Sequence, residues 1–165
     1  MAKLTKDKEY GQIELNQVAF RRDGRIIAQY KLAVDAVENG MLLAVDHVNK
    51  TVGFPTNGQK TGIALNYTTE HMYDERLVYA LKHFRLEKNT FLPRLGLLAA
   101  GDRFTTNAVT YTEGDLEKIA AGTIYGEASS EGYIHLTTSA ENAVLQAIEY
   151  TTMPDGSPAV KFVAL

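Results

Sequence analysis

The nearest approach to a binding motif in this sequence is a pair of glycines placed as in a phosphate-binding loop. Gly53 and Gly58 have the required spacing, but Gln59 separates the second glycine from the lysine and threonine that should follow it directly. The extra residue displaces the ammonium and hydroxyl groups from the phosphate cradle. A phosphate-binding loop also opens a helix, whereas residues 63–68 alternate between two faces as a strand does. We therefore expect this loop to bind no nucleotide.

The histidines form no metal-binding pattern. The chain has no cysteine, which excludes thiolate metal sites and disulfides. No two histidines have the spacing that places a pair of imidazoles on one helix face. The four are His47, His71, His83 and His135. We interpret them as surface or half-buried side chains and expect no metal site.

The remaining polar residues do not indicate catalysis. Ser129 and Ser130 lie between glycines, as flexible loops commonly do, and no serine has the glycine-flanked spacing of a hydrolase nucleophile. Acidic pairs on solvated loops are ordinary; here they are Asp74-Glu75, Asp115 with Glu117, and Glu127 with Glu131. We expect the protein not to be an enzyme and to need no cofactor.

The charge balance argues against nucleic acid as the main partner, because binding a phosphate backbone requires a local excess of basic residues. The 165 residues include 17 basic and 20 acidic ones, for a formal net charge of -3. The arginines of residues 21–25 are the nearest basic cluster, which we interpret as a polar hairpin tip. No stretch approaches the ~20 apolar residues of a membrane helix. We expect neither nucleic acid nor a membrane as partner.

Turn residues recur between short apolar runs in a way that is typical of a sandwich or barrel. We predict a mainly β chain, an antiparallel sandwich or barrel with many short strands and at most one or two short helices. Residues 1–10 mix charges around one leucine and are expected to form a flexible arm. Residues 11–165 are expected to form a single β-rich domain, with a helical turn at 115–119 and a last strand at 159–165.

Turn chemistry and residue type predict two further features. The dipeptide Asp23-Gly24 is a strong turn signal and predicts a hairpin that joins the alternating apolar positions of residues 13–20 to residues 26–34. Residues 104–111 are rich in threonine, valine and aromatic residues, which predicts one strand.

Two segments fit both a helix and a strand. Residues 77–86 have apolar positions that match either period, and we favour a strand. Thr138 and Glu141 have the spacing of a capping box, which predicts a helix from about Ser139. A strand over residues 143–152 is the alternative.

Aromatic residues next to turn residues can anchor contacts between proteins, because they bury much area at low entropic cost. The alternative is that these rings close the ends of the core. Together with the charged arm they supply the candidate interface residues, which are Lys3, Leu4, Lys6, Tyr10, Phe54, Phe91, Pro93, Arg94 and Phe104.

Residues 39–46, 91–96 and 101–107 read NGMLLAVD, FLPRLG and GDRFTTN. They resemble segments of small auxiliary head proteins of tailed bacteriophages. The resemblance implies a β-rich virion protein without an active site, which decorates the outer surface of a phage head, often as a trimer, and ties capsomers together. Its partner would be the major capsid protein of the same virion, and the arm 1–10 would bind the capsid.

Two alternatives stay open. A tail-tube, tail-completion or baseplate component would share the same composition and strand pattern. A small-ligand-binding β-barrel or an enzyme is the second alternative, and its best argument is the polar loop 55–62 beside apolar strands.

Overall fold

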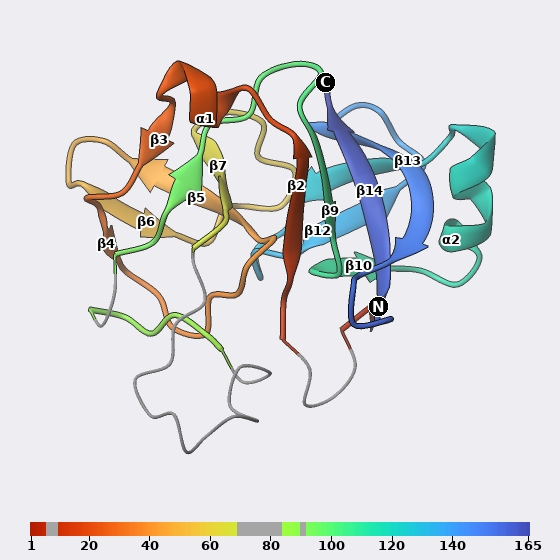
Figure 1. Ribbon diagram of the computed structural model, residues 1–165, viewed down its shortest axis with the longest axis horizontal. Helices are drawn as coiled ribbons and strands as arrows, with labels where there is room; N and C mark the ends of the chain where they lie inside the picture. The colour runs from red at the N-terminus through yellow and green to blue at the C-terminus, as the bar shows by residue number, and fades with distance from the viewer. Residues whose placement is uncertain (6–9, 69–83, 90–91) are drawn as a thin grey trace.

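The computed structural model describes residues 1–5, 10–68, 84–89 and 92–165. These residues form two β-sheets, which lie on the right and the left of Figure 1. The larger sheet has the order β1-β10-β12-β11-β13-β14-β9-β2 and the smaller has the order β3-β8-β7-β5-β6-β4. The described chain is therefore mainly β, as predicted. Neither sheet closes on itself, so the architecture is consistent with a sandwich and not with a barrel.

Most strands are short. The larger sheet contains β1 (Ala2–Lys3), β2 (Ile13–Gln17), β9 (Arg103–Thr106), β10 (Val109–Tyr111), β11 (Tyr125–Ala128), β12 (Ile134–Thr137), β13 (Leu145–Thr152) and β14 (Pro158–Ala164). The smaller contains β3 (Ile26–Ile27), β4 (Lys31–Leu32), β5 (Leu42–Asp46), β6 (Thr51–Gly53), β7 (Ile63–Asn66) and β8 (Leu95–Gly96). The pairs β10–β12 and β4–β6 are parallel, so both sheets are mixed.

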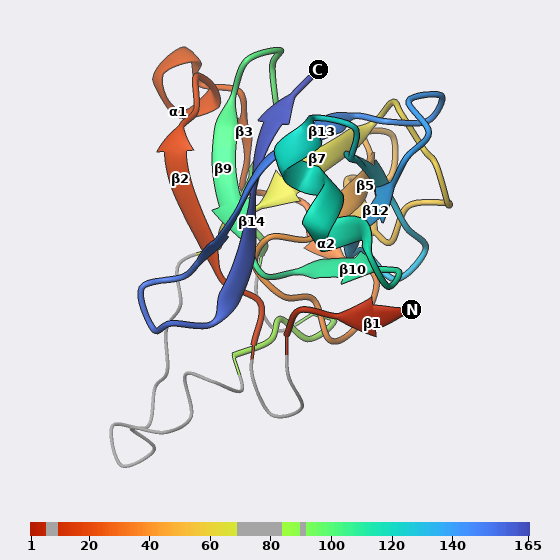
Figure 2. The same ribbon diagram turned by 90° about the vertical axis from the view of Figure 1, so that its right-hand side faces the viewer.

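The helical segments are α1 (Phe20–Asp23), α2 (Asp115–Lys118) and the 3-10 turn η2 (Ile119–Ala121). The predicted helical turn at 115–119 is therefore present as α2. Figure 2 shows α2 lying over the outside of the larger sheet. No helix in the described ranges is long and apolar enough to cross a membrane.

Two clusters of buried apolar side chains form the core. The first is centred on Phe104 and Phe162, whose ring centroids lie 5.8 Å apart. It also includes Leu42 and Leu65 of the smaller sheet, so it joins the two sheets. The second cluster belongs mainly to the smaller sheet and includes Tyr133 from the larger one. Burying each large apolar side chain contributes about 1.5–3 kcal/mol, so these shared clusters hold the sheets together.

The predicted hairpin at Asp23-Gly24 is wrong. The dipeptide ends helix α1, where Gly24 adopts a left-handed conformation with φ of 70° and donates its backbone N–H to the Phe20 carbonyl. The strands on either side belong to different sheets, since β2 pairs with β9 and β3 pairs with β8. Phe20 is fully buried, and its burial favours a helical turn that crosses from one sheet to the other.

The predicted single strand 104–111 is divided into β9 and β10. Between them the side chains of Thr106 and Asn107 bind the backbone of the chain near its start. Thr106 Oγ1 donates to the Gln12 carbonyl at 2.7 Å, and Asn107 accepts from the Gln12 N–H at 2.6 Å and donates to the Tyr10 carbonyl at 3.1 Å. These side chains fill hydrogen-bonding positions that a continuous ladder would fill with backbone groups.

The helix predicted from Ser139 is also wrong, and the alternative strand is present as β13. The Glu141 N–H is bound by Ser139 Oγ at 3.3 Å, and the Ser139 N–H is bound by Thr137 Oγ1 at 3.1 Å. These polar side chains thus accept hydrogen bonds from backbone N–H groups of a turn and do not cap a helix. Of the ambiguous segment 77–86, residues 77–83 lie outside the described residues, and Leu86 forms an isolated antiparallel bridge with Val37.

The chain start is not a free arm over its first residues. Ala2 and Lys3 pair with β10, and the Leu4 N–H donates to the Val109 carbonyl at 3.0 Å. Leu4 is only 4% exposed and belongs to the first core cluster. The expected flexible arm is therefore wrong for residues 2–4, because β10 and the first core cluster supply their partners. Residues 6–9 lie outside the described part.

Candidate functional site

A groove of about 430 Å³ lies where the ends of the two sheets meet. Lys3 belongs to β1, Tyr133 immediately precedes β12, and Phe54 immediately follows β6. Met41, directly before β5, and Arg85 complete the part of the lining that matters here. The groove thus combines aromatic, methionine and arginine side chains, which are the types enriched at protein contacts.

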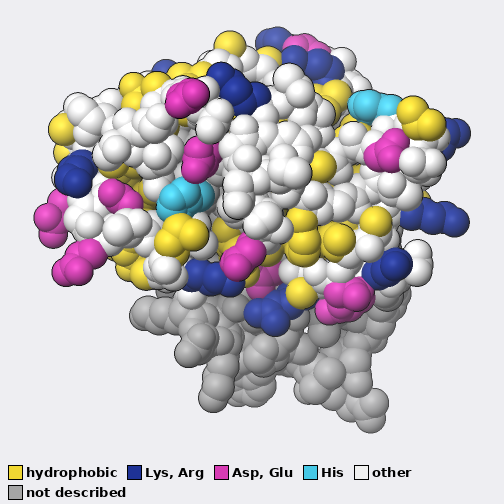
Figure 3. All heavy atoms as spheres, turned by 180° about the vertical axis from the view of Figure 1, so that it is seen from behind, with side chains coloured by type: hydrophobic (Ala, Val, Ile, Leu, Met, Phe, Trp, Pro, Cys, Tyr) yellow, Lys and Arg dark blue, Asp and Glu magenta, His cyan; other side chains and the backbone are white. Residues whose placement is uncertain are grey.

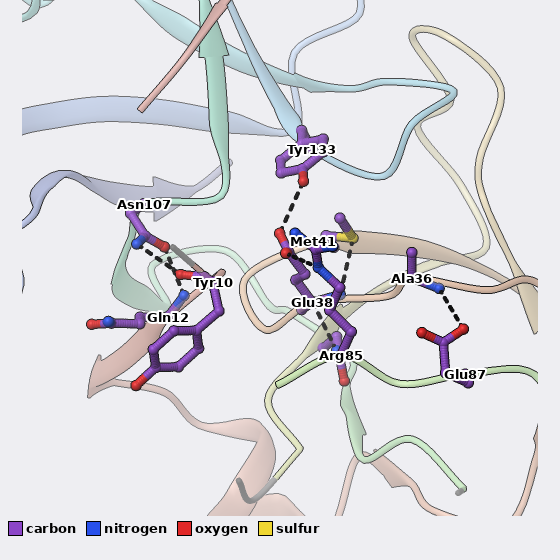
Figure 4. Close-up of polar contacts among 10 residues, drawn as sticks. Tyr10, Gln12, Ala36, Glu38, Met41, Arg85, Glu87, Asn107 and Tyr133 are labelled. Atoms are coloured by element: carbon purple, nitrogen blue, oxygen red, sulfur yellow. Dashed lines mark hydrogen bonds and ion pairs between the residues drawn. The ribbon is translucent and has the colours of Figure 1, made fainter. Parts of the chain in front are cut away.

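A buried carboxylate lies behind this groove. Glu38 is 1% exposed and accepts hydrogen bonds at both oxygens, from Arg85 Nε at 2.7 Å and from the Tyr133 hydroxyl at 2.9 Å (Figure 4). Arg85 is about half exposed, whereas Tyr133 is buried. Because Tyr133 immediately precedes β12 of the larger sheet and Glu38 lies in the connection between β4 and β5 of the smaller, the carboxylate links the two sheets.

The Glu38 carboxylate is held in place by a turn of unusual tightness. Gly40 has a φ of 85°, a backbone conformation that residues with a side chain rarely adopt. A Cβ at this position would also collide with Thr106. The Glu38 carbonyl accepts from Asn66 Nδ2 at 2.9 Å, and the Gly40 N–H donates to the Asn66 carbonyl at 2.9 Å. Gly11 approaches so closely that its Cβ would lie 2.7 Å from the Glu38 Cβ. The turn therefore depends on contacts from three distant parts of the chain.

Electrostatics favour one protonation state for this cluster. Burial raises the pKa of the Tyr133 hydroxyl, and the neighbouring Glu38 carboxylate raises it further. The hydrogen bond to Glu38 raises the pKa of Arg85. Tyr133 thus stays a hydrogen-bond donor and Arg85 stays a cation at neutral pH. The two hydrogen bonds to Glu38 hold the side chains at the floor of the groove in fixed positions.

The rim of the groove is charged. Lys3 Nζ lies 4.1 Å from the centre of the Tyr133 ring and 3.7 Å from Glu131 Oε2. On the other side, Asp35 Oδ1 accepts from the Lys88 N–H at 2.7 Å. Figure 3 shows acidic and basic side chains close together on the rear face, with hydrophobic side chains between them, just above the residues drawn in grey.

The structure brings two of the predicted interface residues together. Lys3 and Phe54 line the same groove although they are far apart in the sequence. Tyr10 is half-buried and packs on the second core cluster, and Arg94 is exposed. Three further candidates are corrected, because a buried side chain cannot present a contact surface: these are Leu4, Pro93 and Phe104. Lys6 and Phe91 lie outside the described residues.

Sequence reasoning missed Glu38 and Arg85. Nothing in the turn Glu38-Asn39-Gly40 marks the carboxylate as buried, because its two partners are 47 and 95 positions away. Tyr133 had one signal, since it follows Gly132 and so belongs to the aromatics that lie beside turns.

The loop that resembles a phosphate-binding loop is held by its own side chains. Gln59 Oε1 accepts from the Thr56 N–H at 3.0 Å, and Gln59 Nε2 donates to the Thr61 carbonyl at 2.8 Å. Lys60 Nζ donates to the Glu141 carbonyl at 2.8 Å. The strand predicted after the loop is present as β7, so the local structure is not that of a phosphate-binding loop.

Of the two described histidines, His47 lies in the turn after β5 and His135 lies in β12. His47 Nδ1 is 2.9 Å from the Tyr30 hydroxyl, and His135 Nδ1 is 3.4 Å from Thr110 Oγ1. Across the described ranges no three potential ligands are grouped as a metal ion requires. Comparison of the chain with protein-family models, curated proteins and solved structures gave no match.

Proposed function

We propose that this protein is a virion structural protein that decorates and stabilises the outer surface of a phage head. Its partner is the major capsid protein, and the contact is made through the groove between the two sheets. The observation that carries the proposal is that Lys3 and Phe54 line one groove together with Tyr133 and Arg85. Arginine and aromatic side chains dominate the energetics of protein contacts.

The build of the groove supports an anchoring role. Its floor is held by the Glu38 carboxylate, so Tyr133 and Arg85 are fixed before any partner arrives. A surface that is already ordered loses little entropy when it binds. Repetition over a shell adds strength, because many modest contacts act together. The resemblance of residues 39–46, 91–96 and 101–107 to auxiliary head proteins points to a capsid as the shell.

The experiment is co-sedimentation of the purified protein with phage heads that lack it. We expect the wild-type protein to sediment with the heads, and Phe54→Ala and Lys3→Glu to weaken binding about tenfold or more, as loss of an anchoring side chain does. Val48→Ala and Lys31→Glu are matched controls, since Val48 is 90% exposed, Lys31 is exposed, and neither lines the groove. Thermal unfolding of each variant shows that it is folded.

The outcomes separate the proposal from its alternatives. Wild-type protein that stays in the supernatant with heads but sediments with tails would replace the head assignment by the tail assignment. If the groove variants bind like their controls while the wild-type protein binds, the groove is not the contact. Stabilisation by nucleotides, sugars or divalent metals would favour a ligand-binding protein, because ligands stabilise the state that they bind.

A further inference from the structure

Another cavity, of about 250 Å³, is lined from both sheets and shares no lining residue with the groove. Leu42 of β5 and Ile63 of β7 line it from the smaller sheet, and Ala164 of β14 lines it from the larger one. Leu98, in the connection between β8 and β9, and Val144, directly before β13, add to its apolar wall. The end of β14 that borders the cavity is at the top of Figure 1.

The cavity lies at the edge of the first core cluster. Leu42 and Ala164 are buried members of that cluster. Ile63, Leu98 and Val144 pack against it but are only half-buried. An apolar group in the cavity would cover the exposed part of these three side chains, which is favourable because apolar surface leaves water. Apolar cavities of about 150 Å³ already bind benzene, so this one is large enough for the tail of a small ligand.

Lys60 is the one charged side chain among the residues that line this cavity. Its Nζ donates to the Glu141 carbonyl at 2.8 Å, so the side chain reaches from the loop before β7 to the segment before β13. This bond uses one of the three N–H groups of the ammonium. Across the described ranges Lys60 forms no ion pair. The cavity thus has an apolar wall and, at its exposed side, a positioned cation with two further donors.

We propose that this cavity binds a small amphiphile with one carboxylate head, whose apolar tail lies between the two sheets and whose head accepts hydrogen bonds from Lys60 Nζ. A water-sized group occupies ~30 Å³, so the cavity holds roughly eight such groups, which is the tail of a medium-chain carboxylate. The single ammonium matches a head with a single negative charge. A pocket with apolar walls and one polar group that orients the ligand is the usual form of a small-molecule site.

Calorimetric titration with three ligands of equal tail length tests the class of ligand. Octanoate should bind about threefold more tightly than octanol, because an exposed ion pair contributes only modestly to binding. Octylammonium should bind most weakly, since its charge repels that of Lys60. Octanoate should also raise the melting temperature, because a ligand stabilises the state that it binds. This site does not depend on the proposed capsid role, so neither result decides the other.

Two variants locate the tail and the head. Leu98→Trp fills the cavity and should abolish binding of both octanoate and octanol, whereas Val48→Trp, at a side chain that is 90% exposed and outside the cavity, should bind both as the wild-type protein does. Lys60→Gln should lower the affinity for octanoate to that for octanol and leave octanol unchanged. Lys31→Gln is its control, since Lys31 is exposed and outside the cavity. Thermal unfolding shows that each variant is folded.

Three results would overturn the proposal. The first is a wild-type protein that binds no octanoate at any concentration below that at which octanoate forms micelles. The second is a Leu98→Trp variant that binds octanoate as well as Val48→Trp does, and the third is a Lys60→Gln variant with the wild-type affinity for octanoate. Co-sedimentation with anionic phospholipid vesicles separates a free carboxylate from a lipid surface: we expect the protein to stay in solution, and binding to vesicles without binding to octanoate would also contradict the proposal.

Discussion

The Glu38 carboxylate accepts hydrogen bonds from Arg85 and Tyr133, and both donors line the groove. A carboxylate that is almost wholly buried is stable only when its oxygens are hydrogen-bonded. Arg85 and Tyr133 meet this requirement at 2.7 and 2.9 Å. Removal of either donor leaves a buried oxygen without its partner, which costs more than the hydrogen bond itself contributed.

Tyr133→Phe tests this arrangement. We expect the free energy of unfolding to fall by ~1–3 kcal/mol, because the change leaves Glu38 Oε2 without a donor. Urea denaturation measures the change. Tyr67→Phe is the matched control, since Tyr67 is half-buried and its hydroxyl has no hydrogen-bond partner among the described residues. Equal effects of the two substitutions would show that the Glu38 contact does not stabilise the fold.

The raised pKa of Tyr133 predicts how stability depends on pH. A free tyrosine has a pKa of 10.0, and burial with the Glu38 carboxylate raises the value for Tyr133 above this in the folded protein. The folded state therefore holds the proton more tightly than the unfolded state, and its advantage is complete below pH 10 and lost as the pH rises further. Urea denaturation across this range should show a shallower decline for Tyr133→Phe than for the wild-type protein; parallel declines would contradict the prediction.

At the scale of elements, the connections between the sheets are the parts that local sequence predicts least well. Glycine, asparagine and proline mark the turns at Glu38-Asn39-Gly40 and at residues 153–157 in the sequence, although contacts from distant residues fix the observed shape of the first. Asp23-Gly24 is an equally good signal, yet burial of Phe20 makes it the end of a helix. The strand β13 likewise overrides a local capping signal, because pairing with β14 satisfies more backbone groups.

For the candidate site too, local sequence does not predict which residues face the groove. Lys3 and Phe54 could be selected from the sequence, since one is a charge near the chain start and the other an aromatic beside a proline. Leu4 and Phe104 were selected by similar reasoning and are buried. Whether such a residue faces the groove or the core is decided by pairing partners far away in the chain, and period-two alternation cannot fix that choice in strands of two to four residues.

Leu4→Ala tests whether the chain start belongs to the fold. Because Leu4 is buried in the first core cluster, we expect its truncation to lower the free energy of unfolding by about 2–5 kcal/mol. Leu92→Ala is the control, since Leu92 is 50% exposed and its truncation should change stability by less than about 0.5 kcal/mol. Chemical denaturation of both variants measures the two changes in the free energy of unfolding. A flexible arm would instead make the two changes equally small.

At the scale of the whole molecule, the groove is the surface that the account assigns to a partner protein. The groove is lined from both sheets and has the side-chain types of a protein contact. If each copy is attached to a shell through this groove at many equivalent positions, the attachment gains from multivalency.

Electron cryomicroscopy of phage heads with and without the protein tests the proposed role most directly. We predict added density on the outer surface of the head that fits the two sheets, with Lys3 and Phe54 turned toward the major capsid protein. Heads that look the same with and without the protein, or density found only in the tail, would contradict the account.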